Sequence, residues 1–280
     1  MIERTGKNAN NYGNTLLIME KYLAFNYRFV IEKQDMKRGR PIIGIIGGMG
    51  PRAGLYLHRK IVEYTPARSD QDHFAIIHYS APFPDRTRAL LYGGTSPLTE
   101  LIKIAAILEN LGACCIAIAC STAHAYISEI QQKIHIPIID MIEKTLEYIS
   151  NTYRNTTKIG LLATNGAIEK RVYHKLFESE GYKILTPSAK TQERIVMKAI
   201  YGKSGIKAGN MQEGVIRSLL NMCQELIKTG AEIVVMGCTD IASEIGEKES
   251  KVPLIDPVDI LARAVIEYVT KQVQKRTKAG

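Results

Sequence analysis

Two cysteines stand at matching places in the chain, each just beyond a short apolar run. Cys120 follows Ile116–Ala119 and Cys238 lies just after Ile233–Met236, and a hydroxyl-bearing residue comes next in both cases. Small and hydroxyl residues favour the start of a helix, so we expect each thiol to lie near the positive end of a helix dipole. Such a place can lower the pKa of a thiol from about 8.5 and supply thiolate near neutral pH.

Two thiols that face each other across a cleft can invert a carbon centre. One sulfur removes a proton from one face of the carbon, and the other returns a proton to the opposite face. General acid and base groups each contribute roughly 10²–10⁴ in rate. The remainder has to come from electrostatic stabilisation of a carbanion-like transition state. Arg or Lys beside a substrate carboxylate would supply it, which agrees with the net charge of +9.

The chain contains an internal repeat that makes these two cysteines equivalent. Three motifs, Ile43–Gly50, Gly112–Cys120 and Ile136–Asp140, recur in the same order as Ile159–Gly166, Gly230–Cys238 and Val252–Asp256. The spacings are 116, 118 and 116 residues, measured from Gly44 to Gly160, from Cys120 to Cys238 and from Asp140 to Asp256. A repeated order at nearly one spacing indicates two homologous halves.

Each half alternates short apolar runs with helix-period segments. The expected strands are Ile42–Ile46, Phe74–Tyr79, Ile116–Ala119, Lys158–Leu162, Tyr182–Leu185 and Ile233–Met236. The expected helices include Ala53–Tyr64, Leu98–Leu111, Ile168–Glu180 and Met211–Thr229. This alternation predicts the α/β class, with two homologous three-layer α/β/α domains of mainly parallel strands related by pseudo-two-fold symmetry. Ligands in such folds bind at the carboxyl ends of the strands, so a site is expected in the cleft between the domains.

The predicted domain boundaries follow the repeat. Residues 40–150 form the N-terminal α/β domain, residues 151–254 the C-terminal one, and residues 255–280 a helix that packs back on the first domain. Residues 1–39 are polar and rich in Asn and Tyr, with no signal-peptide pattern, and are predicted to be an N-terminal extension. Two interpretations of this extension stay open: an appended arm with Met36 as a second start, or a helix around residues 14–31 that docks on the domain.

Five motifs in order resemble the aspartate/glutamate racemase family, in particular its cofactor-independent aspartate racemase branch. They are Ile45-Ile46-Gly47-Gly48-Met49-Gly50-Pro51, Pro84-Asp85-Arg86-Thr87, Ala119-Cys120-Ser121-Thr122-Ala123-His124, Lys207-Ala208-Gly209-Asn210 and Gly237-Cys238-Thr239-Asp240. The resemblance extends from about residue 41 to about residue 268. Glutamate racemases of the cell-wall type usually have DSG in place of Gly47-Gly48-Met49 and His in place of Asp240, so the resemblance favours the aspartate branch.

The resemblance implies roles for individual residues. Cys120 and Cys238 become the two acid/base thiols. Arg86, with its neighbours Pro84 and Asp85, and Lys207 become the groups that hold the substrate carboxylates. The residues implied to line the pocket are Met49, Ser121, Thr122, Ala123 and Thr239. The family also implies a homodimer that works on a small acidic amino acid.

Two departures from the family pattern bear on the substrate. Ser121 stands where the family usually has Asn, and Ser80-Ala81-Pro82-Phe83 replaces an Asn-Pro-Gln type of segment. An amide that could hold a carboxylate or an amino group is missing in both places, and Phe83 is expected to narrow or wall the pocket. Aspartate is the first expected substrate, followed by glutamate or a broader range of amino acids.

Other functions fit the sequence less well. The glycines from Gly44 to Gly50 are out of register for a dinucleotide motif, the charge is scattered, and no recognisable nucleic-acid motif is present. His124 could pair with Cys120 as in hydrolases, but a packed histidine is favoured because the repeat has Ala242 at that place. No metal, no cofactor and no pyridoxal lysine motif is expected. A single-thiol decarboxylase or isomerase of a dicarboxylate and a non-catalytic binder of acidic amino acids remain alternatives.

Composition limits where the protein works. No apolar run is long enough to span a membrane, so neither a membrane nor a nucleic acid is expected as a partner. The five cysteines are an odd number in a large chain without CxxC. That pattern argues against a disulfide framework and for a reducing compartment. A cytoplasmic location is therefore expected.

Overall fold

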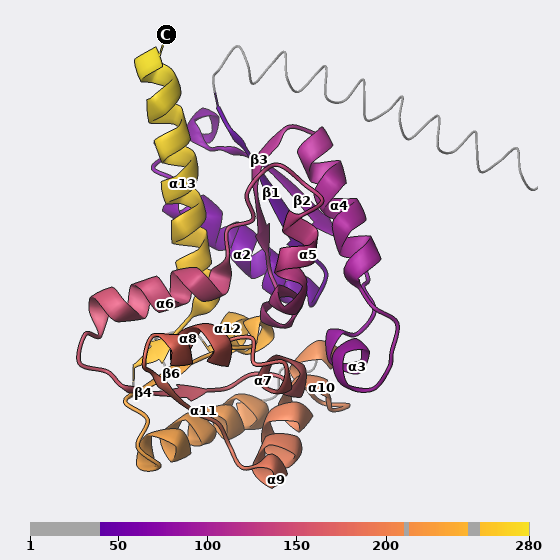
Figure 1. Ribbon diagram of the computed structural model, residues 1–280, viewed down its shortest axis with the longest axis vertical. Coiled ribbons are helices and arrows are strands. Elements are labelled where there is room, and N and C mark those ends of the chain that lie inside the picture. The colour runs from indigo at the N-terminus through magenta and orange to yellow at the C-terminus, as the bar shows by residue number, and fades with distance from the viewer. Residues whose placement is uncertain (1–39, 210–212, 246–252, 280) are drawn as a thin grey trace, which may run out of the picture.

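Two parallel sheets organise the computed structural model, which describes residues 40–209, 213–245 and 253–279 (Figure 1). The first sheet has the order β2-β1-β3 and the second the order β5-β4-β6-β7. The strands are β1 (Ile42–Gly47), β2 (Ala75–Ser80), β3 (Ala113–Ile118), β4 (Lys158–Leu161), β5 (Lys183–Leu185), β6 (Ile233–Val235) and β7 (Leu254–Ile255). The predicted α/β class with parallel strands is confirmed.

The two sheets have the same topology, as the sequence repeat predicts. In the second half β7 lies beside β6, and the amide of Val234 donates to the carbonyl of Pro253 at 3.0 Å. In the first half Ile138 forms a parallel bridge to Ile116, whose amide donates to the carbonyl of Pro137 at 2.9 Å. The three-strand order of each half therefore continues with an equivalent fourth segment. The pseudo-two-fold relation between the halves stays a prediction.

Helices connect the strands, as parallel pairing requires. They are α2 (Pro51–Tyr64), α3 (Arg86–Leu91), α4 (Leu98–Asn110), α5 (Ile127–Gln131), α6 (Met141–Thr152), α7 (Asn165–Glu169), α8 (His174–Ser179), α9 (Ala189–Thr191), α10 (Lys198–Tyr201), α11 (Glu213–Lys228), α12 (Thr239–Ile245) and α13 (Pro257–Ala279). Shorter turns are η1 (Asp70–Asp72), η2 (Ser121–Tyr126), η4 (Ile206–Ala208) and the π-helical η3 (Gln192–Met197). Among the described residues, no helix combines the length and apolar character that crossing a membrane needs.

Strands β1 and β3 of the first sheet are buried on both faces, which explains their continuous apolar sequences, whereas β2 at the edge is only partly buried. Successive side chains of a strand point to opposite faces. Ile45 and Ala117 belong to a core that continues through the second half of the chain. Ile46 and Ile118 belong to a separate core in which the first sheet packs mainly against α4. A strand buried on both faces does not alternate apolar and polar residues, because the side chain at every position packs against apolar neighbours.

Two details differ from the sequence predictions. The single helix expected over Ile168–Glu180 is wrong: α7 ends at Glu169 and α8 begins at His174, with Arg171 between them at φ 56°. A left-handed residue cannot continue a right-handed helix. The second sheet also reaches Ile255 through β7, one residue past the predicted boundary at 254. The extension over 1–39 lies outside the described residues, and the division into domains stays a prediction.

The C-terminal helix α13 lies against α2 and α6 of the first half (Figure 1). Its start is held by buried Asp256, whose Oδ1 accepts from the amides of Val258 at 2.8 Å and Asp259 at 3.2 Å. The other carboxyl oxygen of Asp256 accepts from the hydroxyl of Tyr56 on α2 at 2.7 Å. Burial raises the pKa of Asp256.

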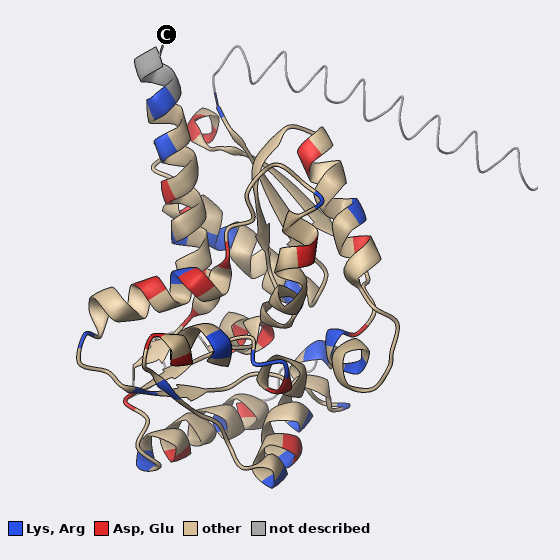
Figure 2. Cartoon of the chain, viewed as in Figure 1, with Lys and Arg blue, Asp and Glu red and all other residues tan. Residues whose placement is uncertain are grey.

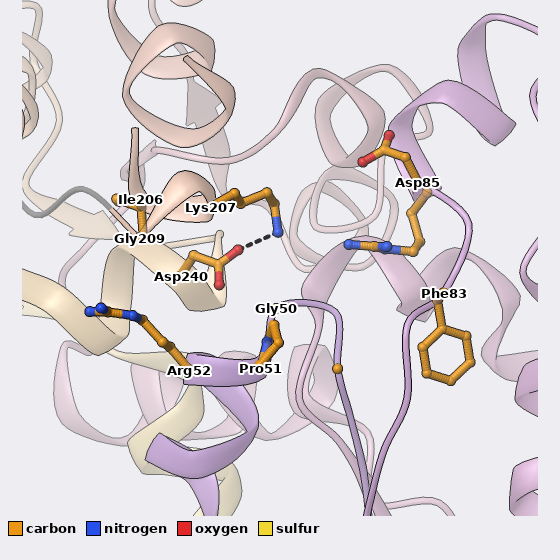
Figure 3. Close-up of a pocket in the computed structure, with 11 residues that line it drawn as sticks. Gly50, Pro51, Arg52, Phe83, Asp85, Ile206, Lys207, Gly209 and Asp240 are labelled. Carbon is orange, nitrogen blue, oxygen red and sulfur yellow. Dashed lines mark hydrogen bonds and ion pairs between the residues drawn. The ribbon is translucent and has the colours of Figure 1, made fainter. Parts of the chain in front are cut away.

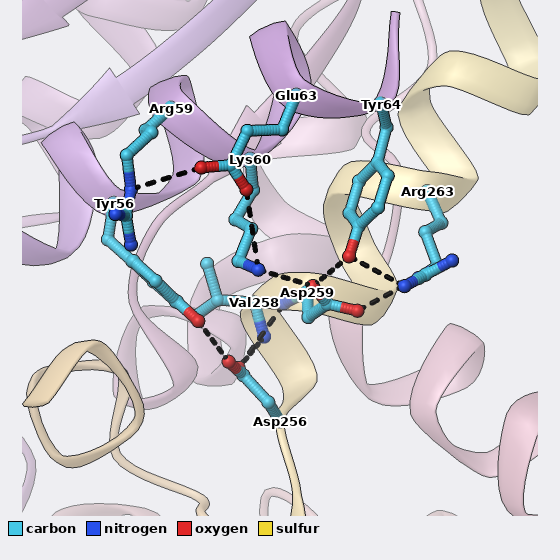
Figure 4. Close-up of polar contacts among 9 residues, drawn as sticks. All are labelled: Tyr56, Arg59, Lys60, Glu63, Tyr64, Asp256, Val258, Asp259 and Arg263. Carbon is cyan, nitrogen blue, oxygen red and sulfur yellow. Dashed lines mark hydrogen bonds and ion pairs between the residues drawn. The ribbon is translucent and has the colours of Figure 1, made fainter. Parts of the chain in front are cut away.

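One turn further along, a second polar group joins α13 to α2 (Figure 4). Asp259 accepts from Arg263 at 2.8 Å and forms an ion pair with Lys60 at 3.0 Å. The hydroxyl of Tyr64 donates to Asp259 and accepts from Arg263. Polar pairs of this kind fix the register of the two helices, because a shifted helix would leave buried oxygens without donors.

Tyr56→Phe is expected to lower the free energy of unfolding by about 1–3 kcal/mol, because the buried carboxyl of Asp256 loses a donor. Urea denaturation measures the change. Tyr148→Phe is the matched control, since Tyr148 is 38% exposed and surface changes of this kind usually stay within about 0.5 kcal/mol. Equal losses in the two variants would show that the bond to Asp256 contributes nothing specific.

Candidate active site

A small inner pocket lies where the two halves meet, and both predicted cysteines line it. The first half contributes Met49, Arg86, Cys120, Ser121 and Thr122, and the second contributes Thr164, Tyr201, Lys207, Cys238, Thr239 and Asp240. Cys120 directly precedes η2 at the end of β3, and Cys238 directly precedes α12 after β6. The repeat therefore brings its two thiols into one pocket, at the carboxyl ends of the strands, where α/β folds bind ligands.

The inner pocket is nearly closed, and a roomier pocket leads up to it. The free space between the inner residues is about 10 Å³, roughly enough for one water molecule. The outer pocket measures about 390 Å³ and shares Arg86, Lys207 and Asp240 with the inner one. Figure 3 shows Phe83 and Asp85 on one side of the outer pocket and Lys207 and Asp240 on the other. A small amino acid fits the outer pocket and reaches the thiols only if side chains between the two pockets move.

Arg86 begins α3 and is only 6% exposed. Its Nη1 donates to the carbonyl of Pro84 and its Nη2 to that of Met49, both at 3.0 Å. Its Nε has no hydrogen-bond partner among the described residues. Burial works to lower the pKa of Arg86, but the neighbouring acidic groups Cys120, Tyr201 and Asp85 outweigh burial and raise it. A guanidinium has five N–H donors, so after two carbonyl bonds it keeps donors for a carboxylate.

Lys207 and Asp240 form an ion pair at the border of the two pockets. The Nζ of Lys207 lies 2.5 Å from Oδ2 of Asp240, and it also lies over the ring of Tyr201, 5.6 Å from the centroid. Burial works to lower the pKa of Lys207, but the charge of Asp240 and the hydrogen bond to it raise it, so the amine stays protonated. The backbone of Gly50 makes room for this pair, because a Cβ there would lie 2.6 Å from Oδ1 of Asp240.

The electrostatic surroundings of the two sulfurs differ. Burial raises the pKa of Cys238 to about 12, and the nearby carboxylate of Asp240 adds to the effect; Lys207 and two backbone amides oppose it. The expectation that the helix start makes this thiol acidic is therefore wrong for Cys238 in this structure, because burial outweighs the amides. Cys120 lies near the guanidinium of Arg86 instead.

Asp240→Asn is expected to lower the pKa of Cys238, because it removes a negative charge while the positive charge of Lys207 stays. Below its pKa, the thiolate fraction rises about tenfold for each unit by which the pKa falls. Alkylation of Cys238 by iodoacetamide at pH 8–9, followed by peptide mass spectrometry, should therefore become faster. Cys223, a buried thiol on α11 whose pKa is also raised to about 12, is the internal control. Faster alkylation of both thiols would indicate general loosening instead.

The hydroxyl groups of the inner pocket join the two halves. Ser121 lies 3.1 Å from the hydroxyl of Tyr173, and Thr122 lies 2.9 Å from that of Thr164. Thr239 donates to the carbonyl of Ala119 at 3.2 Å. Ser121, Thr122 and Thr239 line the inner pocket, and their hydrogen bonds link its two walls.

Three predicted residues lie elsewhere. Asp85 lines the outer pocket and accepts from the amide of Arg88 at 2.8 Å, which caps α3. Pro84 lines neither pocket and acts through its carbonyl, which accepts from Arg86. Ala123 is fully buried in the core of the first half. Phe83 walls the outer pocket, as expected.

The sequence analysis missed Thr164, Tyr201 and Asp240 as residues of the inner pocket, although Asp240 was noted as part of a family motif. Thr164 stands 116 residues after Gly48, so the repeat itself gave a signal for it. Tyr201 ends the short helix α10, and its hydroxyl lies 3.3 Å from that of Thr87 across the two halves. Burial raises the pKa of Tyr201, so it stays neutral. No spacing in the sequence points to it.

His124 and the glycine-rich segment have structural roles. The Nδ1 of His124 lies 2.9 Å from the carbonyl of Cys120, and its Nε2 accepts from the amide of Met141 at 3.3 Å. This is the packed histidine that the repeat favoured, and it lines neither pocket. Gly48 has φ 89°, and a Cβ there would lie 1.9 Å from the carbonyl oxygen of Ala81, so only glycine fits. Within the described ranges, no group of His, Cys, Asp or Glu is arranged to hold a metal.

Comparison with known proteins assigns the chain to a family. The model of the family described as Asp/Glu/hydantoin racemase matches residues 46–265. The chain belongs to this family, and the resemblance noted from five motifs is confirmed.

Individual relatives cover nearly the same region. The chain is 27% identical over 235 residues to the broad specificity amino-acid racemase RacX of Bacillus subtilis (strain 168), an alignment that covers 80% of this chain and 96% of that protein. The aspartate racemase of Picrophilus torridus superimposes with a TM-score of 0.72 at 27% identity, over 82% of this chain and 94% of that one. An aspartate racemase homologue from Pyrococcus horikoshii gives a TM-score of 0.62 at 25% identity, over 81% and 98% of the two chains.

Proposed function

We propose that the protein is an amino-acid racemase that interconverts L- and D-aspartate, or a related acidic amino acid, by proton transfer between Cα and two cysteines. The observation that carries the proposal is that Cys120 and Cys238, from equivalent strand ends of the two halves, line one pocket together with Arg86 and Lys207. One sulfur takes the α-proton, the other donates a proton to the opposite face, and the configuration inverts.

The charges around the pocket support an acidic amino acid as substrate. Such a molecule carries two carboxylates and one ammonium group. The charged residues that line both the inner and the outer pocket are two cations, Arg86 and Lys207, and one anion, Asp240. Arg52 and Asp85 line only the outer pocket, where Arg52 pairs with Glu244 and Asp85 accepts from the amide of Arg88. The planar fork of Arg86 suits a carboxylate, and Asp240 can accept the ammonium group once the substrate has separated it from Lys207. Cations near the carboxylates also stabilise the negative charge that develops as the α-proton leaves.

The choice between aspartate and a broader range of amino acids depends on how the substrate side chain is held. The Picrophilus torridus relative is an aspartate racemase, whereas the Bacillus subtilis relative has broad specificity. The absence of two amides expected from the family pattern favours looser selection at the outer pocket, whose wall includes Phe83. We rank aspartate first because two carboxylates match two cations.

The proposal includes the setting in which the enzyme works. We propose a cofactor-independent enzyme that acts as a homodimer in the cytoplasm. None of the five cysteines, all of which lie in described segments, forms a disulfide, and thiol chemistry of this kind needs reduced sulfur.

Proton exchange with solvent tests the proposal directly. Incubated with L-aspartate in D₂O, the protein should yield D-aspartate that carries deuterium at Cα, as seen by NMR and chiral chromatography. Release of CO₂, or exchange with retained configuration, would favour a single-thiol decarboxylase or isomerase. Saturable binding of aspartate without any exchange would identify a binding protein and overturn the racemase proposal.

A further inference from the structure

A second pocket, away from the thiols, lies in the second half of the chain. It is formed by η3, α10, the turn after α10 and the start of α11, and it measures about 590 Å³. Its lining residues are Arg194, Ile195, Lys198, Ala199, Gly202, Lys203, Ser204, Gly214, Val215 and Ser218. It shares no residue with the inner or the outer pocket of the candidate active site. Figure 2 shows Lys and Arg residues in this corner, around α9 and α10.

Three positive side chains border this pocket without a counter-charge. Arg194, Lys198 and Lys203 are exposed, and none forms a hydrogen bond or ion pair with another residue of the described segments. No carboxylate is among the described lining residues. The acidic neighbours are engaged elsewhere: Glu193 accepts from Asn165 at 3.0 Å, and Glu213 pairs with Arg217. Three unpaired cations around one hollow attract an anion with more than one negative charge.

The rest of the wall is suited to an organic group beside that charge. Ile195, Ala199 and Val215 present apolar surface. The hydroxyl of Ser204 is exposed and makes no hydrogen bond within the described part of the chain, whereas Ser218 already donates to the carbonyl of Val215 at 2.7 Å. Selective small-molecule sites combine an apolar wall with a few polar groups.

We propose that this pocket binds a small organic phosphate, with the phosphoryl oxygens held by Arg194, Lys198 and Lys203 and the organic part against Ile195 and Val215. A phosphate presents several strong acceptor oxygens and close to two negative charges at neutral pH. Arg binds such a group as a fork and Lys as a point charge.

The position of the pocket connects it to the candidate active site. Lys198 begins α10, and the last residue of the same helix, Tyr201, lines the inner pocket. After α10, the amide of Gly202 donates to the carbonyl of Lys198 at 2.9 Å, and that of Gly205 donates to the carbonyl of Gly202 at 2.8 Å. This hydrogen-bonded turn leads directly to Lys207. A ligand held by Lys198 and Lys203 therefore steadies the segment that carries two active-site side chains.

Titration calorimetry with phenyl phosphate tests the binding. At about 0.15 M salt, the attraction between exposed charges more than about 8 Å apart is largely screened, so binding requires close contact with the pocket. Wild type should bind saturably and more tightly than it binds inorganic phosphate. The triple variant Arg194→Gln, Lys198→Gln and Lys203→Gln should bind at least about tenfold more weakly, because three charge-assisted contacts are lost. The control triple Arg154→Gln, Lys170→Gln and Lys175→Gln removes the same charge from exposed positions outside the pocket and should bind like wild type.

Amide hydrogen exchange provides a second measurement that does not depend on turnover. Phenyl phosphate should slow exchange in residues 198–208 of wild type and of the control triple, but not in the pocket triple. The proposal is overturned if wild type does not bind saturably, if inorganic phosphate binds as tightly as phenyl phosphate, or if both triple variants lose binding equally. Because neither measurement uses an amino-acid substrate, these outcomes stand apart from the success or failure of the racemase proposal.

Discussion

Cys120→Ala and Cys238→Ala are each expected to abolish racemisation, with kcat/KM lower by about 10³ or more, because each removes one of the two groups that handle the proton. The two variants should differ in a second measurement. Each keeps one sulfur on one side of Cα, so each should exchange the α-proton of one enantiomer with D₂O without inverting it. The preferred enantiomer should be opposite in the two variants, and NMR of L- and D-aspartate in D₂O measures it.

The control for these variants is Cys114→Ala, a thiol on β3 that lines neither the inner nor the outer pocket. It should keep the activity of wild type. Full racemisation by either of the two site variants would exclude the two-thiol mechanism. Exchange of the same enantiomer by both variants would place both sulfurs on one face of the substrate, which is incompatible with inversion between them.

Arg86→Lys is expected to lower kcat/KM by about 10²–10³, although the positive charge is kept. A lysine cannot reproduce the fork that bonds the carbonyls of Pro84 and Met49 at the same time. It would leave buried acceptors without donors and move the cation away from Cys120. The loss of one positioned donor to a developing negative charge is typically of this size. Steady-state kinetics with both enantiomers measures it.

The matched control lies two residues along the same helix. Arg88 on α3 is exposed, so Arg88→Lys should change neither kcat nor KM appreciably. Thermal unfolding separates the chemical effect of Arg86→Lys from a structural one, since the loss of activity should remain when the variant is assayed well below its Tm. Activity of Arg86→Lys within about twofold of wild type would show that charge alone is sufficient at this position.

The sequence predicted those parts of the fold and site that depend on local pattern and on the repeat. Continuous apolar runs gave the buried parallel strands, and the equivalence of Cys120 and Cys238 placed both at strand ends in one pocket. The sequence pattern could not predict the helix break at Arg171, because an arginine does not mark a left-handed conformation in the way that a glycine does. The split of Ile168–Glu180 into α7 and α8 follows from that one residue.

The tertiary features of the site were also outside the reach of pattern analysis. The pKa of Cys238 depends on how deeply the sulfur is buried and on Asp240, and neither depth nor neighbour is encoded in spacing. Tyr201 reaches the pocket because α10 packs where the halves meet, which is a property of the assembled chain. Lys207 was predicted to hold a substrate carboxylate, and in the structure its ammonium group forms an ion pair with Asp240.

The unlike surroundings of the two sulfurs give the proposed reaction cycle a direction. Burial and the carboxylate of Asp240 raise the pKa of Cys238 and so keep the proton on that sulfur at rest. In the proposed mechanism a protonated Cys238 acts as the acid, so the resting enzyme reacts with the antipode whose Cα–H bond points toward Cys120. After one inversion Cys120 carries a proton and Cys238 has lost one. Cys238 must regain a proton before the same antipode can react again. At saturating substrate, the return of the proton to Cys238 becomes a candidate for the rate-limiting step beside cleavage of the Cα–H bond. The rates of the two directions of the reaction therefore depend differently on substrate concentration.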